Sequence, residues 1–245
     1  MLFALAALLT AATGQMPFGT PSEGGLTGSP ALPTSDVLPY GAFAVGCSGG
    51  VFWPGPGGTA GLAELRGCLG VTESMEAGIS VPVWLSDGSW ESGAGPGDVT
   101  LAAKYLYEEV RGGTALAFTG RLRLPTGDIP RDRGSELGIG FCTSTTYRLF
   151  RLSFAAEYAL AGGADPFDSR IEDRGYFGLA GTSFITPDLE TFAGLSGCTS
   201  GSLSADAGVI LSPFENYFAW LGARVALQGE DLFAIRAGVS TTREI

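Results

Sequence analysis

Apolar and polar side chains alternate with a period of two residues along most of the chain. Residues 149–160 show this most clearly, since one set of alternate positions is apolar and the other carries Arg151, Ser153 and Glu157. Successive side chains of a strand point to opposite faces, so this pattern predicts a β-strand with one apolar and one polar face. The same alternation occurs in four further segments, at residues 75–85, 99–107, 114–124 and 217–227.

We count about twelve such segments of about nine to twelve residues, the length that a tilted strand needs to cross a bilayer. Their connections alternate between short turns, at 72–74, 111–113, near Tyr147 and at 186–188, and long Gly-, Pro- and Asp-rich loops, at 54–61, 86–97, 125–135 and 161–173. The alternation weakens after Cys198, because the connections at 200–202 and 228–231 are both short. Short turns at one end and long loops at the other predict an all-β, antiparallel transmembrane β-barrel of about twelve strands.

The charge balance excludes one class of partner. The chain carries 14 Lys and Arg against 25 Asp and Glu, a formal net charge of -11. Nucleic acid binding requires a basic surface, so no nucleic acid partner is expected. Only 16% of residues are charged, which favours membrane lipid as the partner of the outer surface. A secreted soluble β-sandwich is the alternative, but the alternating loop lengths speak against it.

The first part of the chain differs from the rest. Residues 1–12 are apolar, and small residues follow at Ala12, Thr13 and Gly14, which predicts a signal peptide over residues 1–14 and a mature start near Gln15. No Lys or Arg precedes the apolar run. Residues 15–41 are rich in Pro, Gly, Ser and Thr, and we interpret them as an irregular lead-in, a periplasmic arm or a partial plug. Residues 42–245 are then the barrel, in the cell outer membrane.

Aromatic side chains on the apolar face fall near the strand ends. Tyr107, Phe150 and Tyr217 lie beside short turns, whereas Trp53 and Tyr158 lie beside long loops. Amphipathic aromatic rings favour the two membrane–water interfaces, so these positions predict two aromatic girdles.

Most kinds of chemistry are excluded by composition. The chain has no His, which removes Ser-His-Asp and Cys-His catalysis and His-ligated zinc. The four cysteines, Cys47, Cys68, Cys142 and Cys198, contain no C-x-x-C motif; three full disulfide pairings are open, as is a role as small unpaired fillers. Acidic residues Asp165, Asp168, Glu172 and Asp173 match no calcium-loop spacing, so we interpret them as a solvated loop. We therefore expect no enzyme activity, no cofactor and no metal.

The charged residues on the polar face are the best candidate functional residues. Strand parity places twelve of them inside the barrel: Glu64, Arg66, Glu76, Lys104, Arg121, Arg123, Glu136, Arg151, Glu157, Asp206, Arg224 and Arg236. Neighbouring strands carry both signs, with Lys104 expected beside Arg121 and Arg123, and Arg151 near Glu136. In one hypothesis these residues line a narrow pore and set its selectivity. In the other they pair with one another and fill a small lumen.

Several segments resemble a known family. They are residues 33–41 (PTSDVLPYG), 64–82 (ELRGCLGVTESMEAGISVP), 97–105 (GDVTLAAKY) and 121–128 (RLRLPTGD). Together they are similar to proteobacterial outer-membrane β-barrel proteins of the transporter group for the MetA pathway of phenol degradation, over roughly residues 33–160. The resemblance implies an outer-membrane channel for small hydrophobic or aromatic solutes and supplies no catalytic residues. The alternative function is a closed barrel with a structural or surface-interaction role.

Overall fold

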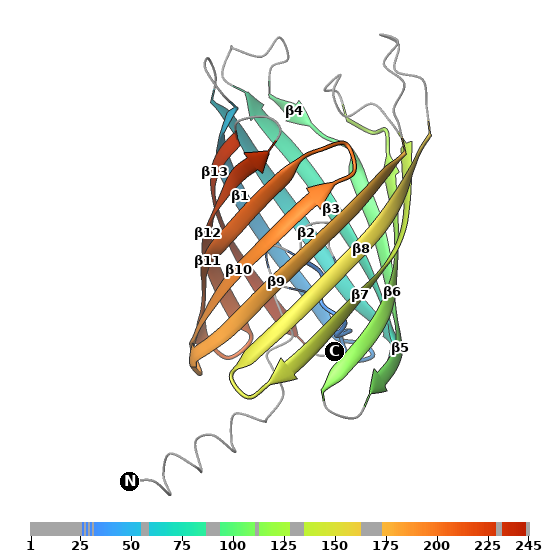
Figure 1. The fold of residues 1–245 in the computed structure, drawn as a ribbon, viewed down its shortest axis with the longest axis vertical. Coiled ribbons are helices and arrows are strands. Elements are labelled where there is room, and N and C mark those ends of the chain that lie inside the picture. The colour runs from blue at the N-terminus through green and yellow to red at the C-terminus, as the bar shows by residue number, and fades with distance from the viewer. Residues whose placement is uncertain are drawn as a thin grey trace, which may run out of the picture.

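The computed structural model describes residues 26, 28, 30, 32–54, 59–86, 94–110, 113–127, 135–162, 173–228 and 232–243. They form a closed barrel of long antiparallel strands (Figure 1). The twelve long strands are β1 (Phe43–Pro54), β2 (Ala60–Thr72), β3 (Met75–Ser86), β5 (Val99–Val110), β6 (Thr114–Leu124), β7 (Ser135–Tyr147), β8 (Phe150–Gly162), β9 (Arg174–Thr186), β10 (Leu189–Cys198), β11 (Leu203–Phe214), β12 (Tyr217–Gln228) and β13 (Leu232–Arg243). The two-residue strand β4 (Gly95–Pro96) pairs with β3. The predicted fold class is confirmed.

The barrel closes because its first and last long strands pair. β1 and β13 are antiparallel and in register from Phe43 opposite Arg243 to Pro54 opposite Leu232. Each long strand therefore has a hydrogen-bonded neighbour on both sides, which removes the open edges that a membrane does not tolerate. No helix long and apolar enough to cross a membrane occurs in the part of the chain that the structure describes.

The turns between β2 and β3, β7 and β8, β9 and β10, and β11 and β12 lie together at one end, which we call the turn end (Figure 1). Three predicted turns are observed, between β2 and β3, between β7 and β8, and between β9 and β10. Of the predicted turn at 111–113, only Gly113 lies within the described residues. Arg148 and Asn216 sit in two of the turns with φ values of 54° and 67°. Such left-handed residues match the twist of a tight hairpin, so two residues suffice to reverse the chain.

The opposite end, which we call the loop end, carries the other connections. Most residues of the predicted long loops lie outside the described residues, including Asp165, Asp168 and Glu172. Asp173 is described, and its Oδ2 accepts a hydrogen bond of 3.2 Å from the Tyr158 hydroxyl. The short connection after Cys198 turns through Gly201, whose φ is 98°.

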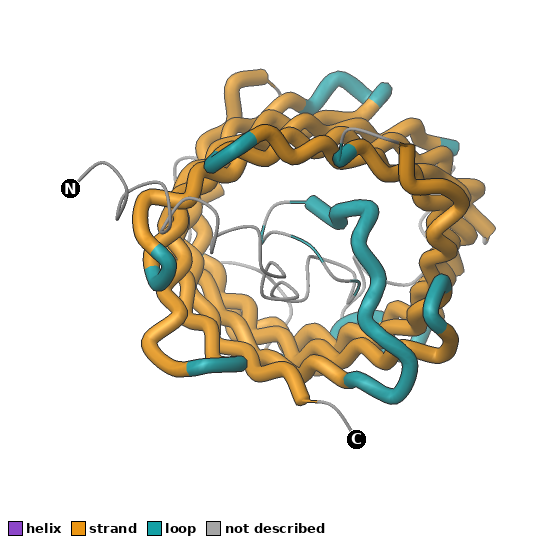
Figure 2. The backbone as a smooth tube through the Cα atoms, turned by 90° about the horizontal axis from the view of Figure 1, so that it is seen from below, coloured by secondary structure: helices purple, strands orange, loops and turns teal. Residues whose placement is uncertain are grey.

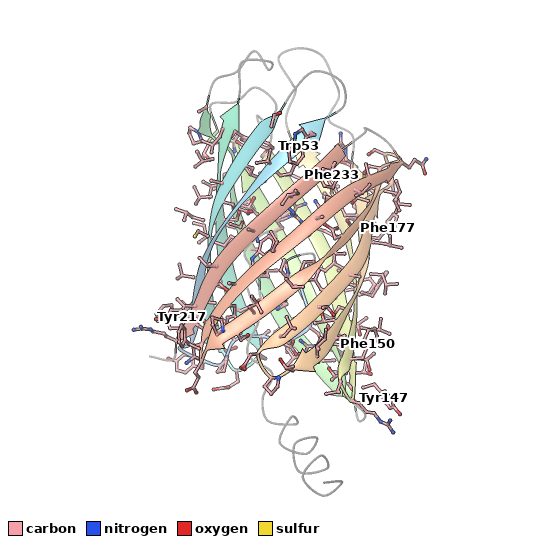
Figure 3. The ribbon with its side chains drawn as sticks, turned by 90° about the vertical axis from the view of Figure 1, so that its left-hand side faces the viewer. Trp53, Tyr147, Phe150, Phe177, Tyr217 and Phe233 are labelled. Carbon is pink, nitrogen blue, oxygen red and sulfur yellow. The ribbon has the colours of Figure 1, made fainter. Side chains whose placement is uncertain are left out.

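The two faces of the barrel differ as the alternation predicts. On β7, Leu137, Ile139 and Phe141 are exposed on the outer face, while Glu136 and Cys142 are buried on the inner face. The outer aromatic residues labelled in Figure 3 lie near the strand ends. Trp53 and Phe233 stack at the loop end with ring centroids 5.4 Å apart, and Phe150 and Tyr217 lie at the turn end (Figure 3). The other predicted girdle residues, Tyr107 and Tyr158, are also exposed.

None of the disulfide pairings that the sequence leaves open is formed. All four cysteines are free thiols. Cys47 is exposed, Cys68 and Cys142 are buried, and Cys198 is half-buried at the end of β10.

A charge placed on the outer face tests the membrane-spanning orientation. Ile139, in the middle of β7, is 62% exposed on that face. We expect Ile139→Arg to lower the free energy of unfolding by about 2–4 kcal/mol, as for an arginine at the bilayer midplane. Denaturant titration of the barrel refolded in lipid vesicles measures this. The control, Thr72→Arg beside a turn, should cost about 0–1 kcal/mol, and equal losses for both variants would contradict the orientation.

Candidate functional site

The segment before β1 enters the lumen and forms a floor at the turn end. Figure 2 shows it crossing the interior of the ring of strands. We call residues 32–42 the floor segment. Leu38 is completely buried and packs with Ala42, Ala44 and Cys68. Backbone hydrogen bonds join Gly41 N to Gly70 O at 3.0 Å and Gly70 N to Ala42 O at 2.8 Å.

Gly70 is required by this close approach. A Cβ atom at this position would lie 1.9 Å from the carbonyl oxygen of Pro39, which no side chain could tolerate. The backbone of β2 therefore meets the backbone of the floor segment directly, and the position favours glycine for lack of space rather than for its φ.

A buried ion pair holds the middle of the floor segment. Lys104 Nζ lies 2.8 Å from Glu76 Oε1, and neither side chain is exposed. Lys104 Nζ also donates to Thr34 O at 2.9 Å, and Leu38 N donates to Glu76 Oε2 at 3.0 Å. A buried ion pair offsets its desolvation only if its remaining donors and acceptors are satisfied. Here the backbone of the floor segment supplies those partners, so pair and segment stabilise each other.

A second set of contacts fixes the floor segment to β7 and β8. Arg151 Nη2 lies 2.6 Å from Asp36 Oδ2, and Ser35 N donates to Ser144 Oγ at 3.1 Å. The Cys142 thiol donates to Thr34 O at 3.2 Å. The expectation that Arg151 lies near Glu136 is wrong, because the antiparallel register places Arg151 opposite Thr146 and Glu136 opposite Ala161. Arg151 is thus near the turn end and Glu136 near the loop end.

The floor segment meets an apolar part of the inner wall on β9–β12, which the sequence analysis did not predict. Leu32 packs in a buried cluster with five inward-facing residues of β9–β12: Ala180, Phe192, Ile210, Phe218 and Trp220. Glycines behind these rings leave room for them, since a Cβ at Gly208 would lie 2.6 Å from the Phe192 ring and one at Gly238 2.5 Å from the Trp220 indole nitrogen. The sequence carries one signal for this, because residues 217–221 (YFAWL) are apolar on both faces.

The charges on the loop-end half of β6–β8 form one connected group. Arg121 donates to Glu157 Oε1 through Nε at 3.0 Å and Nη2 at 2.5 Å, and through Nη2 to Glu136 Oε1 at 2.6 Å. Arg123 Nη2 is 3.6 Å from Glu136 Oε2. Arg121 reaches across β7 because its register partner there is Gly138, where a Cβ would lie 2.5 Å from Glu157 Oε1. The Arg121 guanidinium also lies over the Tyr176 ring, 5.7 Å from its centroid.

The remaining predicted charges form two smaller groups on the inner wall. Asp206 Oδ1 accepts hydrogen bonds from Arg224 Nε at 2.8 Å and from Arg236 Nη2 at 3.0 Å. Glu64 pairs with Arg66 and accepts a hydrogen bond from Ser80. The structure thus places all twelve predicted residues on the inner wall, and each of the seven cations among them lies within ion-pair distance of a carboxylate.

A cavity of about 530 Å³ occupies the lumen above the floor segment. Leu32 and Pro33 of the floor bound it on one side, and Trp84, Asp98 and Cys198 lie on its lining toward the loop end. Arg121, Arg123, Glu136 and Glu157 line its wall, as do Glu64 and Arg224. Among the described residues no group of three or more Cys, Asp or Glu is arranged to hold a metal ion. The cavity is large enough to hold a small solute.

The reactivity of Cys142 tests whether the buried ion pair holds the floor segment in place, because the Cys142 thiol donates a hydrogen bond to Thr34 O of that segment. We expect Lys104→Met to loosen the floor segment, because it leaves Glu76 buried without its cation. Cys142 should then react with a small maleimide at least several-fold faster, as measured by site-resolved mass spectrometry. In the control, Arg224→Met, the pair that is lost joins β12 to Asp206 of β11, and the rate should not change. Unchanged labelling in Lys104→Met would show that the pair does not hold the floor.

This architecture is shared with solved outer-membrane proteins. The chain is similar to an outer membrane channel from Pseudomonas putida F1, with a TM-score of 0.69 and 14% identity over 85% of this chain and 98% of that one. It is similar to the KdgM porin in complex with disordered oligogalacturonate (TM-score 0.60, 8% identity, 81% and 98% covered) and to the NanC porin (0.60, 10%, 80% and 98%). No curated protein sequence matches it. A family model matches residues 15–165, and the chain therefore belongs to the family described as "Putative MetA-pathway of phenol degradation".

Proposed function

We propose that the protein is a passive outer-membrane channel for small uncharged solutes, hydrophobic or aromatic in character. The observation that carries the proposal is the cavity of about 530 Å³ inside a closed barrel, where each of the seven predicted inward cations lies within ion-pair distance of a carboxylate. The family description and the similar channel and porin structures support it. The proposal assigns transport to the protein and no catalysis.

The pairing of the wall charges favours neutral solutes. A charged solute that enters a narrow lumen loses part of its hydration and needs an unpaired opposite charge in return. Arg121 and Asp206 each already have two partners, so the wall offers little such compensation. Uncharged solutes avoid that cost, and the cavity lining includes the rings of Trp84 and Tyr176 and the side chains of Leu32 and Pro33.

The proposed location is supported by the apolar outer surface and is consistent with the signal peptide that the sequence predicts. Large apolar side chains are exposed along the outer face of the strands, which suits contact with lipid. In the proposal, residues 1–14 direct export and the barrel inserts in the outer membrane. The floor segment then lies on the periplasmic side, because short turns face the periplasm in outer-membrane barrels.

A closed structural barrel is the second candidate. The fully buried pair of Lys104 and Glu76, with its bonds to Thr34 and Leu38, favours it because it fixes the floor segment across the lumen. Vesicle-swelling rates with neutral solutes of graded size separate the two candidates. A channel raises the rate for small solutes above that of empty vesicles, whereas a closed barrel does not.

The role of the wall arginines is tested by ion selectivity. We expect Arg121→Ala/Arg123→Ala to raise the cation-to-anion permeability ratio several-fold, because Glu136 and Glu157 lose their cationic partners and face the lumen. Reversal potentials across a planar bilayer under a salt gradient measure this ratio. Arg148→Ala/Arg243→Ala removes the same charge from exposed positions at the turn end and should leave the ratio unchanged. Equal ratios in the wild type and both variants would contradict a route through this lumen.

A further inference from the structure

The two ends of the floor segment are attached to the barrel in different ways. Toward β1, Leu38 is fully buried, its N–H donates to Glu76, and Gly41 is bonded to the backbone of β2. The other end, residues 32–36, meets β7 and β8 through side chains of the wall. A segment that is fixed at one end and held by side chains at the other can turn about its fixed end while every strand stays paired.

The charged contact at the second end joins Arg151 to Asp36, with Nη2 and Oδ2 2.6 Å apart. The Asp36 side chain is 35% exposed and also accepts a hydrogen bond of 3.0 Å from Thr34 Oγ1, so it stays hydrated and bonded if the pair opens. The Arg151 side chain is only 15% exposed, and its Nε has no acceptor. A buried cation that loses its carboxylate is strongly destabilising. The pair therefore opens only if a second carboxylate is within reach of Arg151.

Glu190 of β10 is in the right place to be that second carboxylate. It is half-buried, lies opposite Ile210 of the apolar cluster, and shares the inner face with Phe192 two residues away. Thr182 of β9 pairs with Arg151 on one side and with Phe192 on the other, so one strand separates Arg151 from Glu190. The two charges interact electrostatically. In the described part of the chain, no cation lies within ion-pair distance of Glu190.

Leu32 stabilises the floor segment in its observed position, which we call the closed form. This side chain is 9% exposed and packs in the apolar cluster of β9–β12. Movement of residues 32–36 away from the wall would return Leu32 and the side chains that it covers to the lumen, and this loss of apolar burial disfavours the released form. The released form is then a minor population, which a slow chemical label can detect.

We propose that Arg151 is a latch with two positions. In the closed form it pairs with Asp36. In the released form it pairs with Glu190, while residues 32–36 turn away from the wall about the fixed end at Leu38. The inference deepens the proposed function, on which it rests, because release connects the cavity to the turn end of the barrel. Glu190, which is not among the twelve predicted inward charges, then sets how often the floor opens.

Two substitutions that each remove one carboxylate test the latch through the labelling rate of Cys142, whose thiol bonds to Thr34 O. Asp36→Asn removes the closed-form partner of Arg151, and Cys142 should react with a small maleimide several-fold faster. Glu190→Gln removes the released-form partner, and Cys142 should react several-fold more slowly. Site-resolved mass spectrometry of the refolded barrel measures both rates. A loss of negative charge alone would move both rates in the same direction.

Three further variants serve as controls. Glu215→Gln removes a carboxylate from an exposed turn and should leave the rate of Cys142 labelling unchanged. Glu190→Ala removes the carboxylate without adding an amide and should slow the labelling as Glu190→Gln does. In a barrel that already carries Arg151→Met, Glu190→Gln should have no effect, because the latch is absent.

The outcomes separate the inference from the proposed function. A labelling rate equal to or above that of the wild type in either folded Glu190 variant overturns the latch, as does a slowing by Glu190→Gln that persists with Arg151→Met. Vesicle swelling with small neutral solutes is measured on the same preparations. Opposite changes in labelling without solute flux in any variant would refute the channel and leave the latch. Flux through the wild type with a labelling rate that does not respond to Glu190 would refute the latch and leave the channel.

Discussion

The hydrogen bonding of β1 with β13 is the contact on which the rest of the structure depends. In the hydrocarbon core of a bilayer no water can satisfy a backbone N–H or C=O, so a sheet must leave no edge. β1 meets β13 along its whole length, and every other long strand pairs with two neighbours. Closure forces one face of each strand toward lipid and the other toward a lumen. The two-residue alternation of the sequence is the direct result of that division.

Closure also creates a problem inside the barrel, because the lumen must be filled or hydrated without leaving unpaired charges. Glycines on the inner face leave room for the side chains that fill the lumen. Gly138 lets Arg121 reach Glu157 across an intervening strand, and Gly208 makes room for the Phe192 ring. At the turn end the floor segment fills part of the lumen, and its backbone supplies hydrogen-bond partners to the buried Lys104 and Glu76. The volume left over is the cavity.

Strand parity predicts which face a residue occupies, and the inward placement of the twelve charges could therefore be derived from the sequence. Parity does not predict the neighbour of a residue, because that depends on the register between strands. Arg151 shows this, since it meets Asp36 of the floor segment rather than Glu136. The inward positions of Phe192 and Trp220 could not be predicted for a related reason. An apolar residue on the inner face is expected only where another apolar group covers it, and here that group is Leu32 of the floor segment.

The central claim is that solutes cross the membrane through the lumen, and Cys198 allows a direct test. This thiol lies on the cavity lining, half-buried at the loop end. In a barrel that retains Cys198 as its only cysteine, a bulky maleimide should reduce the flux of small neutral solutes into vesicles several-fold. The same label on a single cysteine at the exposed turn position, Glu215→Cys, should not change the flux. An equal flux through both labelled barrels would contradict a route through the lumen.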